Sequence, residues 1–234
     1  MKKIIINVLL SIIMGIFCIQ YAFAGPFGIN MGMTLAEVRS VCKTNPKHLE
    51  GDVYEISPFK TNDMFKTYSV RIDPDYGVYW LKAIGKDIYT NDYGEDLKAS
   101  FESLVKSISK TYGEESFRND ELKEGSHWGE PNYFMHALKN GDRKLYALWD
   151  KELDIRDIAF EKVLSGEILS TDLADTTFMT NYVLDIVSNY DKLPEDISSI
   201  YVGADAINTS KGYVVLEYSF SNKAGVKAKT DSVF

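Results

Sequence analysis

Cysteine is scarce in this chain of 234 residues, with only Cys18 and Cys42 present. Cys18 lies inside an apolar N-terminal leader that we expect to be removed, which leaves Cys42 alone. A single cysteine excludes an intramolecular disulfide, and a chain of this size can bury an adequate core without one. Cys42 follows Val38 and Val41 on the apolar side of a predicted helix. We therefore expect a buried structural thiol rather than a nucleophile.

Histidine is also rare, at three residues, and the sequence has no H-E-x-x-H pair and no cysteine–histidine spacing typical of zinc. It lacks the G-x-S-x-G turn of serine hydrolases and both glycine-rich nucleotide motifs. Carboxylates from Asp150 to Glu161 follow calcium-loop spacing, but Ile155 stands where the sharp turn needs glycine. We thus predict no catalytic residue, no cofactor and no metal. The alternative is a hydrolase whose site uses carboxylates scattered along the sequence.

Charged residues are absent between Lys3 and Glu37. Residues 4–19 are dominated by Ile, Leu, Val, Met and Phe, and Ala22-Phe23-Ala24 places small residues at positions −3 and −1 of a cleavage site. A short basic start, an apolar run and an A-x-A site form a secretory signal peptide. We predict cleavage between Ala24 and Gly25, with export to the periplasm or the extracellular space. Retention of this segment as a membrane anchor is the alternative.

The predicted mature chain is acidic. Loss of Lys2 and Lys3 leaves 24 basic residues against 34 acidic ones, a formal net charge of −10. Such a chain is not attracted to nucleic acid or to anionic lipid by its mean field. We expect an envelope or secreted protein as the partner, no nucleic acid, and no membrane span once the signal is removed.

Periodicity and turn residues define the predicted elements of the first half. Thr34 and Glu37 form a capping box that starts a helix. A second, longer helix runs from Gly94 to Tyr112, with Asp92 as its predicted cap and Gly113 at its end. Strands are expected at residues 27–31, 53–56, 65–72 and 78–84, the last two joined as a hairpin by the turn at 73–77.

The second half is predicted to begin with a charged surface connection at residues 114–125. It continues with a helix at 131–139, a strand at 145–149, a helix at 176–190, and a hairpin of strands 200–207 and 213–220. This order lacks regular βαβ alternation. It favours an α+β fold, a mostly antiparallel sheet with helices on one face. Residues 25–234 are predicted to form a single domain, with a possible sub-division near 114–126.

The glycine-containing loop at residues 125–131 carries His127 and Trp128. Aromatic residues are enriched at interfaces, and functional residues concentrate on loops. We therefore select Trp128 and His127 as tentative surface interaction residues. His127, Glu130 and His136 could also meet in space, but ordinary surface histidines are expected there.

The stretch Gly32-Met33-Thr34 with Val38, just after an exported N-terminus, resembles the start of the outer-membrane assembly lipoprotein family (BamE/OmlA) and of β-lactamase-inhibitor-like modules. That resemblance implies a small α+β module that binds other proteins and has no catalytic activity. The chain departs from the lipoproteins because bulky Phe17 precedes Cys18, where lipidation requires a small residue.

A second resemblance covers three separate parts of the chain. Gly28-x-x-x-Gly32-Met33-Thr34, the 125–131 loop and the segment from Gly212 to Asn222 are similar to a group of uncharacterised exported bacterial proteins. This implies a shared fold and no stated function. From these observations we expect an exported, non-catalytic binding or protein-interaction module.

Overall fold

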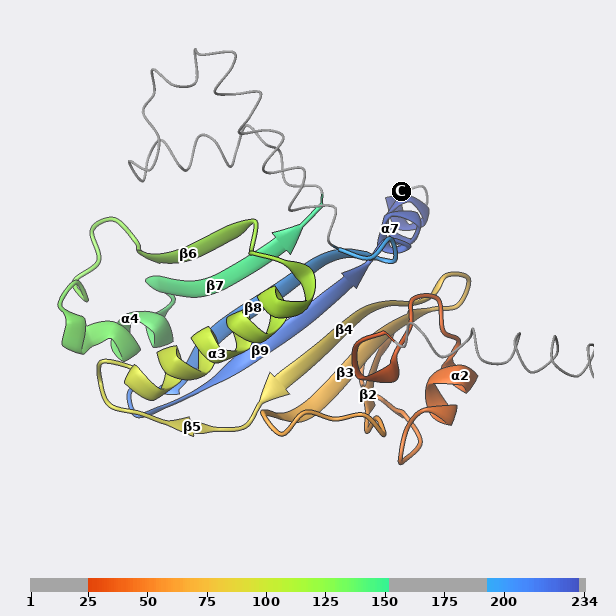
Figure 1. Cartoon of the computed structure of the whole chain (residues 1–234), viewed down its shortest axis with the longest axis horizontal. Helices are drawn as coiled ribbons and strands as arrows, with labels where there is room; N and C mark the ends of the chain where they lie inside the picture. The colour runs from red at the N-terminus through yellow and green to blue at the C-terminus, as the bar shows by residue number, and fades with distance from the viewer. Residues whose placement is uncertain (1–24, 152–192, 232–234) are drawn as a thin grey trace, which may run out of the picture.

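The computed structural model describes residues 25–151 and 193–231 (Figure 1). The strands of this part of the chain form one nine-stranded sheet in the order β1-β2-β3-β4-β9-β8-β7-β6, with β5 paired to β9. The strands are β1 (Lys47–His48), β2 (Val53–Ile56), β3 (Phe65–Asp73), β4 (Gly77–Gly85), β5 (Ile88–Tyr89), β6 (Phe117–Leu122), β7 (Arg143–Asp150), β8 (Ile197–Asn208) and β9 (Lys211–Phe220). The predicted signal peptide, the predicted 176–190 helix and Glu161 lie outside the described residues.

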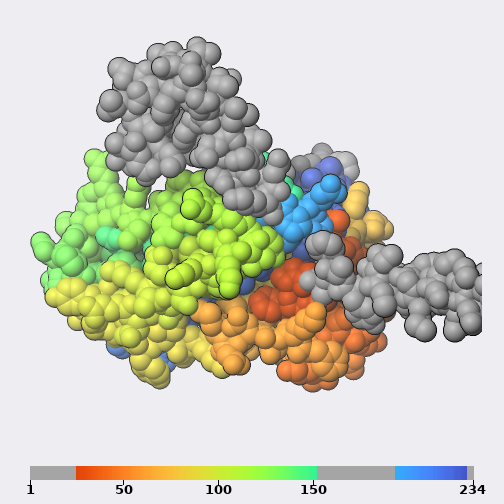
Figure 2. All heavy atoms as spheres, viewed as in Figure 1, coloured from red at the N-terminus to blue at the C-terminus, as the bar shows by residue number. Residues whose placement is uncertain are grey.

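The predicted α+β class is confirmed, because every strand pairing is antiparallel and helices α2 (Leu35–Ser40), α3 (Glu95–Tyr112) and α4 (Phe134–Asn140) contribute to one core. Figure 1 shows α3 lying across β8 and β9, with α2 in front of the β2–β3 end of the sheet. In the space-filling view of Figure 2, side chains of α3 and of the N-terminal segment fill this face.

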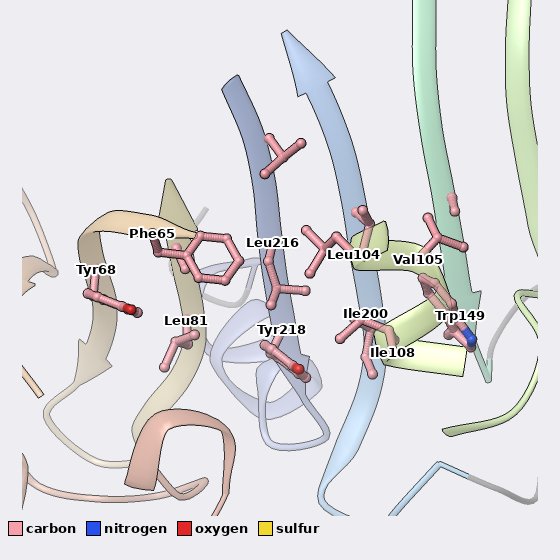
Figure 3. Close-up of a cluster of buried hydrophobic side chains, with 14 of the residues drawn as sticks. Phe65, Tyr68, Leu81, Leu104, Val105, Ile108, Trp149, Ile200, Leu216 and Tyr218 are labelled. Atoms are coloured by element: carbon pink, nitrogen blue, oxygen red, sulfur yellow. The ribbon is translucent and has the colours of Figure 1, made fainter. Parts of the chain in front are cut away.

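The core forms between α3 and alternate side chains of the sheet. Leu104, Val105 and Ile108 of α3 lie over the strands that carry Leu216 and Ile200 (Figure 3). All five side chains are at most 7% exposed. Burying an aliphatic side chain of this size contributes about 1.5–3 kcal/mol, so this helix–sheet contact is a main source of stability.

Both predicted hairpins are present. In the first, β3 and β4 pair from Asp73↔Gly77 to Phe65↔Gly85, with two register shifts. In the second, β8 and β9 pair from Ile197↔Phe220 to Asn208↔Lys211. The second loop is shorter than the predicted 208–212, because Asn208 and Lys211 already belong to the ladder.

The predicted strand at residues 27–31 is wrong. Pro26–Gly28 form a 3-10 turn, η1, in which Phe27 adopts a left-handed conformation with φ of 57°. This conformation places the Phe27 ring 5.8 Å from Phe65 and 4.9 Å from Tyr68, both edge-on. Tertiary aromatic packing overrides the extended preference of the local sequence.

The capping box is confirmed: the Glu37 N–H donates to Thr34 Oγ1 at 3.3 Å, and the Thr34 N–H donates to Glu37 Oε2 at 2.8 Å. The predicted cap of α3 is wrong. Gly94 occupies the cap position instead of Asp92, and the first free N–H groups of α3 reach other side chains. Glu95 N–H donates to Asn91 Oδ1 at 3.3 Å and Asp96 N–H to Thr90 Oγ1 at 3.1 Å.

Residues 114–125 are not a simple surface connection. Residues 117–122 form β6, the strand at one edge of the sheet, which pairs with β7 from Phe117↔Leu148 to Leu122↔Arg143. The segment FRNDEL is mostly charged or polar and does not alternate between apolar and polar residues, so the sequence does not predict a strand there. Charged side chains on an edge strand are a common device against edge-to-edge association.

The C-terminal helix α7 (Lys223–Asp231) packs against the β3–β4 turn. Lys229 Nζ lies 2.5 Å from Asp75 Oδ2 and 3.5 Å from Asp73 Oδ1. Just before the helix, the Asn222 side-chain amide donates to the carbonyls of Tyr76 at 2.8 Å and Val78 at 3.0 Å. These contacts fix α7 beside the end of the sheet, as Figure 1 shows near the C label.

Candidate functional site

The sheet has a second face, opposite α2, α3 and α4. We call it the open face and define it by side chains that alternate with the core positions. Of the described helices, only α7 lies against it. From β3 to β6 the register places on it Ser69, Arg71, Trp80, Lys82, Glu217, Ser219, Ser199, Tyr201, Tyr146, Leu148, Phe117 and Asn119. The aromatic members are partly exposed.

Trp80 of β4 is fixed on the open face by charged neighbours. Its indole Nε1–H donates to Glu217 Oε2 at 3.2 Å, and Lys82 Nζ lies 2.8 Å from Glu217 Oε1. The Arg71 guanidinium lies 5.4 Å from the indole ring, within cation–π range. An indole held on three sides is pre-organised, so binding a partner would order it little further.

A row of three aromatic rings crosses the neighbouring strands. Phe117 lies 5.8 Å from Tyr146, and Tyr146 stacks on Tyr201 at 5.6 Å with an interplanar angle of 27°. We call these three residues the aromatic row. Tyr201 lies over Gly203, where a Cβ atom would come within 2.5 Å of the phenol oxygen. Glycine at 203 therefore lets the ring lie flat along the sheet.

The phenol of Tyr201 stays protonated over the whole physiological range. Burial, followed by the negative charges of Asp205 and Glu217, raises the pKa of Tyr201 to about 12. A neutral hydroxyl can both donate and accept a hydrogen bond. The aromatic row thus offers an uncharged surface with a polar handle, as is common for tyrosine at interfaces.

Beside the aromatic row and Trp80, α7 and the sheet flank an open pocket of about 510 Å³. We call it the α7 pocket. Its lining is mainly polar and consists of Asp150, Ser198, Ser199, Ser219, Phe220, Ser221, Lys223, Ala224, Lys227 and Ala228. Lys223 Nζ donates a hydrogen bond of 3.2 Å to Ser219 Oγ across this pocket.

The tentative residues Trp128 and His127 lie elsewhere, in the loop before α4. Trp128 is partly buried, stacks on His136 at 5.1 Å and meets Tyr133 edge-on at 5.4 Å. His127 is exposed and does not join this cluster. The structure brings neither residue near the aromatic row, because the loop leads into η2 (Pro131–Tyr133) and α4 on the helical side of the sheet.

Cys42 is 7% exposed, and burial raises the pKa of its thiol, as expected for a structural cysteine.

His48 Nε2 lies 2.7 Å from the Gly51 carbonyl oxygen, so this histidine contributes to a local turn. Among residues 25–151 and 193–231, no three His, Cys, Asp or Glu side chains lie close enough together to hold a metal ion.

The open face could be predicted only in part. Ile200-Tyr201-Val202 and Val214-Val215-Leu216 are continuous apolar runs, which indicate strands buried on both sides. These runs predict that Tyr201 and Val215, which point away from the core face, are also at least partly covered. Nothing in the local sequence could have brought Trp80 to Glu217, which lies 137 positions away.

No family model, no curated protein and no solved structure matches this chain. In the part of the chain that the structure describes, no helix combines the length and apolar character needed to cross a membrane.

Proposed function

We propose that the mature chain is an exported, non-catalytic protein-interaction module and that the open face is its contact surface. The observation that carries this proposal is the band of partly exposed aromatic side chains, Trp80 and the aromatic row, on the face away from α3. Trp, Tyr and Arg are the residues most enriched among those that dominate binding energy at protein interfaces. The open face presents all three types.

The size of the open face fits such a role. From β3 to β6 it spans six adjacent strands, or about 24 Å at the usual strand spacing, and eight residues of strand extend about 27 Å. The product, about 650 Å², is close to the ~800 Å² that each partner buries in a standard interface.

Charge distribution restricts the kind of partner. The face carries four basic residues, Arg71, Lys82, Lys144 and Lys211, together with five acidic ones, Glu55, Glu121, Asp150, Asp205 and Glu217. Balanced charge around an aromatic centre favours a protein surface with an apolar centre and a mixed polar rim. It does not favour a polyanion such as nucleic acid. The predicted signal peptide directs the search to envelope and secreted proteins.

The test is a pull-down from the native cell envelope with residues 25–234 as bait, followed by affinity measurement with the captured protein. Replacing both Tyr146 and Tyr201 with alanine is expected to weaken binding by about thirtyfold, as loss of a hot spot of about 2 kcal/mol would. The matched control replaces Phe59 and Tyr93, which are 62% and 48% exposed and lie in loops rather than on the strands of the face. Equal binding by both variants, each with a native circular dichroism spectrum, would refute the proposal.

One observation favours a second candidate, a hydrolase. Ser219 Oγ and Lys223 Nζ lie 3.2 Å apart in the α7 pocket, and serine–lysine pairs serve as nucleophile and base in some hydrolases. A lysine base must be desolvated to lose its proton, whereas Lys223 is exposed. Labelling by a fluorophosphonate probe that Ser219→Ala abolishes would favour the hydrolase; absence of labelling favours the interaction module.

A further inference from the structure

Two lysines of α7 face the α7 pocket without an acidic partner. Lys223 and Lys227 both line it and are four residues apart, so they lie on the same side of the helix. Neither forms an ion pair with any residue that the structure describes. Like charges at this spacing destabilise a helix, and an anion held between them would remove that cost.

The sheet supplies hydroxyl groups opposite these lysines. Ser199 and Ser219 are paired across β8 and β9, so their side chains lie next to each other on the open face. Ser219 Oγ is 3.2 Å from Lys223 Nζ, whereas the Ser199 hydroxyl makes no hydrogen bond within the described residues. Two ammonium groups and two hydroxyls therefore surround one side of the pocket with hydrogen-bond donors.

The helix itself adds to the positive potential. Of the α7 residues that line the pocket, Lys223 and Ala224 belong to the first turn of the helix. The amino-terminal end of a helix carries a partial positive charge and free N–H groups, which favour a nearby anion. The predicted mature chain has a formal net charge of −10. The described lining of the pocket, by contrast, holds two lysines and one carboxylate, Asp150, so its own formal charge is positive.

We infer that the α7 pocket binds a small polar molecule through a carboxylate or phosphate group. Lys223 and Lys227 hold the oxyanion, and Ser199 and Ser219 donate to its oxygens. A volume of about 510 Å³ lies within the range of small-molecule sites, about 300–1,000 Å³. The serine-rich remainder suits a ligand that also carries hydroxyl or amino groups. This site goes beyond the proposed function, because it does not use the aromatic row.

The test is a titration of ¹⁵N-labelled residues 25–234 with three probes at constant ionic strength: inorganic phosphate, citrate and, as the uncharged control, glycerol. We expect saturable shifts of the backbone N–H signals of Ser199, Ser219 and Ala224 with phosphate, citrate or both, and none with glycerol. The anion that binds more tightly distinguishes a phosphate ligand from a carboxylate ligand.

Two lysine variants distinguish anion binding in the pocket from a general attraction of anions to surface lysines. Replacing both Lys223 and Lys227 with glutamine is expected to weaken anion binding at least about tenfold, since hydrogen bonds to charged groups contribute about 1.5–3 kcal/mol. The matched control replaces Lys106 and Lys110, an exposed pair at the same spacing on α3. Equal weakening by both variants, or shifts spread over all surface lysines, would overturn the inference. The aromatic-row variant should keep anion binding, so this test is independent of the partner test.

Discussion

At the scale of single residues, Cys42 combines burial with a thiol whose pKa is raised by desolvation. Only the thiolate reacts with disulfide reagents, so the folded protein, prepared as residues 25–234, should react with Ellman's reagent far more slowly than the same protein in urea. Because its pKa is higher in the folded state, the neutral thiol contributes its full stability below about pH 8.5 and loses it as the pH rises further.

Unfolding measured in urea between pH 7 and pH 10 checks the sign of this effect, with Cys42→Ala as the control that lacks the titrating group. The wild-type protein should lose more stability than the variant over that interval. Rapid labelling of the native protein would instead place Cys42 in an accessible, activated environment.

Gly77 shows how one residue can depend on a distant part of the chain. Its φ is 68°, and a Cβ atom there would lie 2.1 Å from the Gly32 carbonyl oxygen. We expect Gly77→Ala to lower the free energy of unfolding by about 2–4 kcal/mol, from backbone strain together with a clash. Gly51 is the matched control, since its φ is 57° and nothing lies within 4 Å of the added atom. Gly51→Ala should cost only about 1–2 kcal/mol; equal losses at both positions in urea unfolding would exclude the clash.

At the scale of elements, α3 joins the helical side of the molecule to the sheet. Phe101 is fully buried, whereas Lys106 on the same helix is exposed. Phe101→Ala should lower the free energy of unfolding by about 3–5 kcal/mol, through lost transfer energy and the cavity that it leaves. Lys106→Ala should change it by no more than about 0.5 kcal/mol. Thermal or urea unfolding followed by circular dichroism measures both, and similar values would show that α3 does not belong to the core.

Elements with a strong local pattern could be predicted from the sequence. The 18 residues of α3 follow one apolar stripe, and the two hairpins alternate clearly, so the structure confirms all of them. β6 could not be predicted, because Arg118, Asp120 and Glu121 fit an exposed connection equally well. Its strand character comes from pairing with β7, a contact between distant residues that no local window contains.

The candidate site was harder to predict than the fold. A tryptophan in a glycine-containing loop is often functional, and this favours Trp128 as an interaction residue, but in the structure its ring packs against His136 and Tyr133. The aromatic row depends on the register between β6, β7 and β8. A shift of one residue would move Tyr201 to the opposite face, and composition does not fix that register.

At the scale of the whole molecule, the pairing of β4 with β9 bears on the number of domains. A sub-division near 114–126 would separate these strands, and it would also separate α3 from β8 and β9. We therefore expect residues 25–234 to unfold in one cooperative step, with tryptophan fluorescence and circular dichroism giving the same midpoint. A fragment of residues 25–116 should not fold alone. Two separate transitions, or a folded fragment, would indicate two units.

The β4–β9 ladder also has a consequence for the time at which the protein can fold. Leu81 pairs with Tyr218, so the centre of the sheet cannot close until nearly the whole chain is present. Contacts between such distant residues form slowly, because a long loop must be closed before they contribute stability. An exported chain that crosses a membrane from its amino terminus would meet its last central strand only at the end of transit. The topology that makes the finished sheet continuous would thus keep the chain unfolded while it is being threaded, which is the state that threading requires.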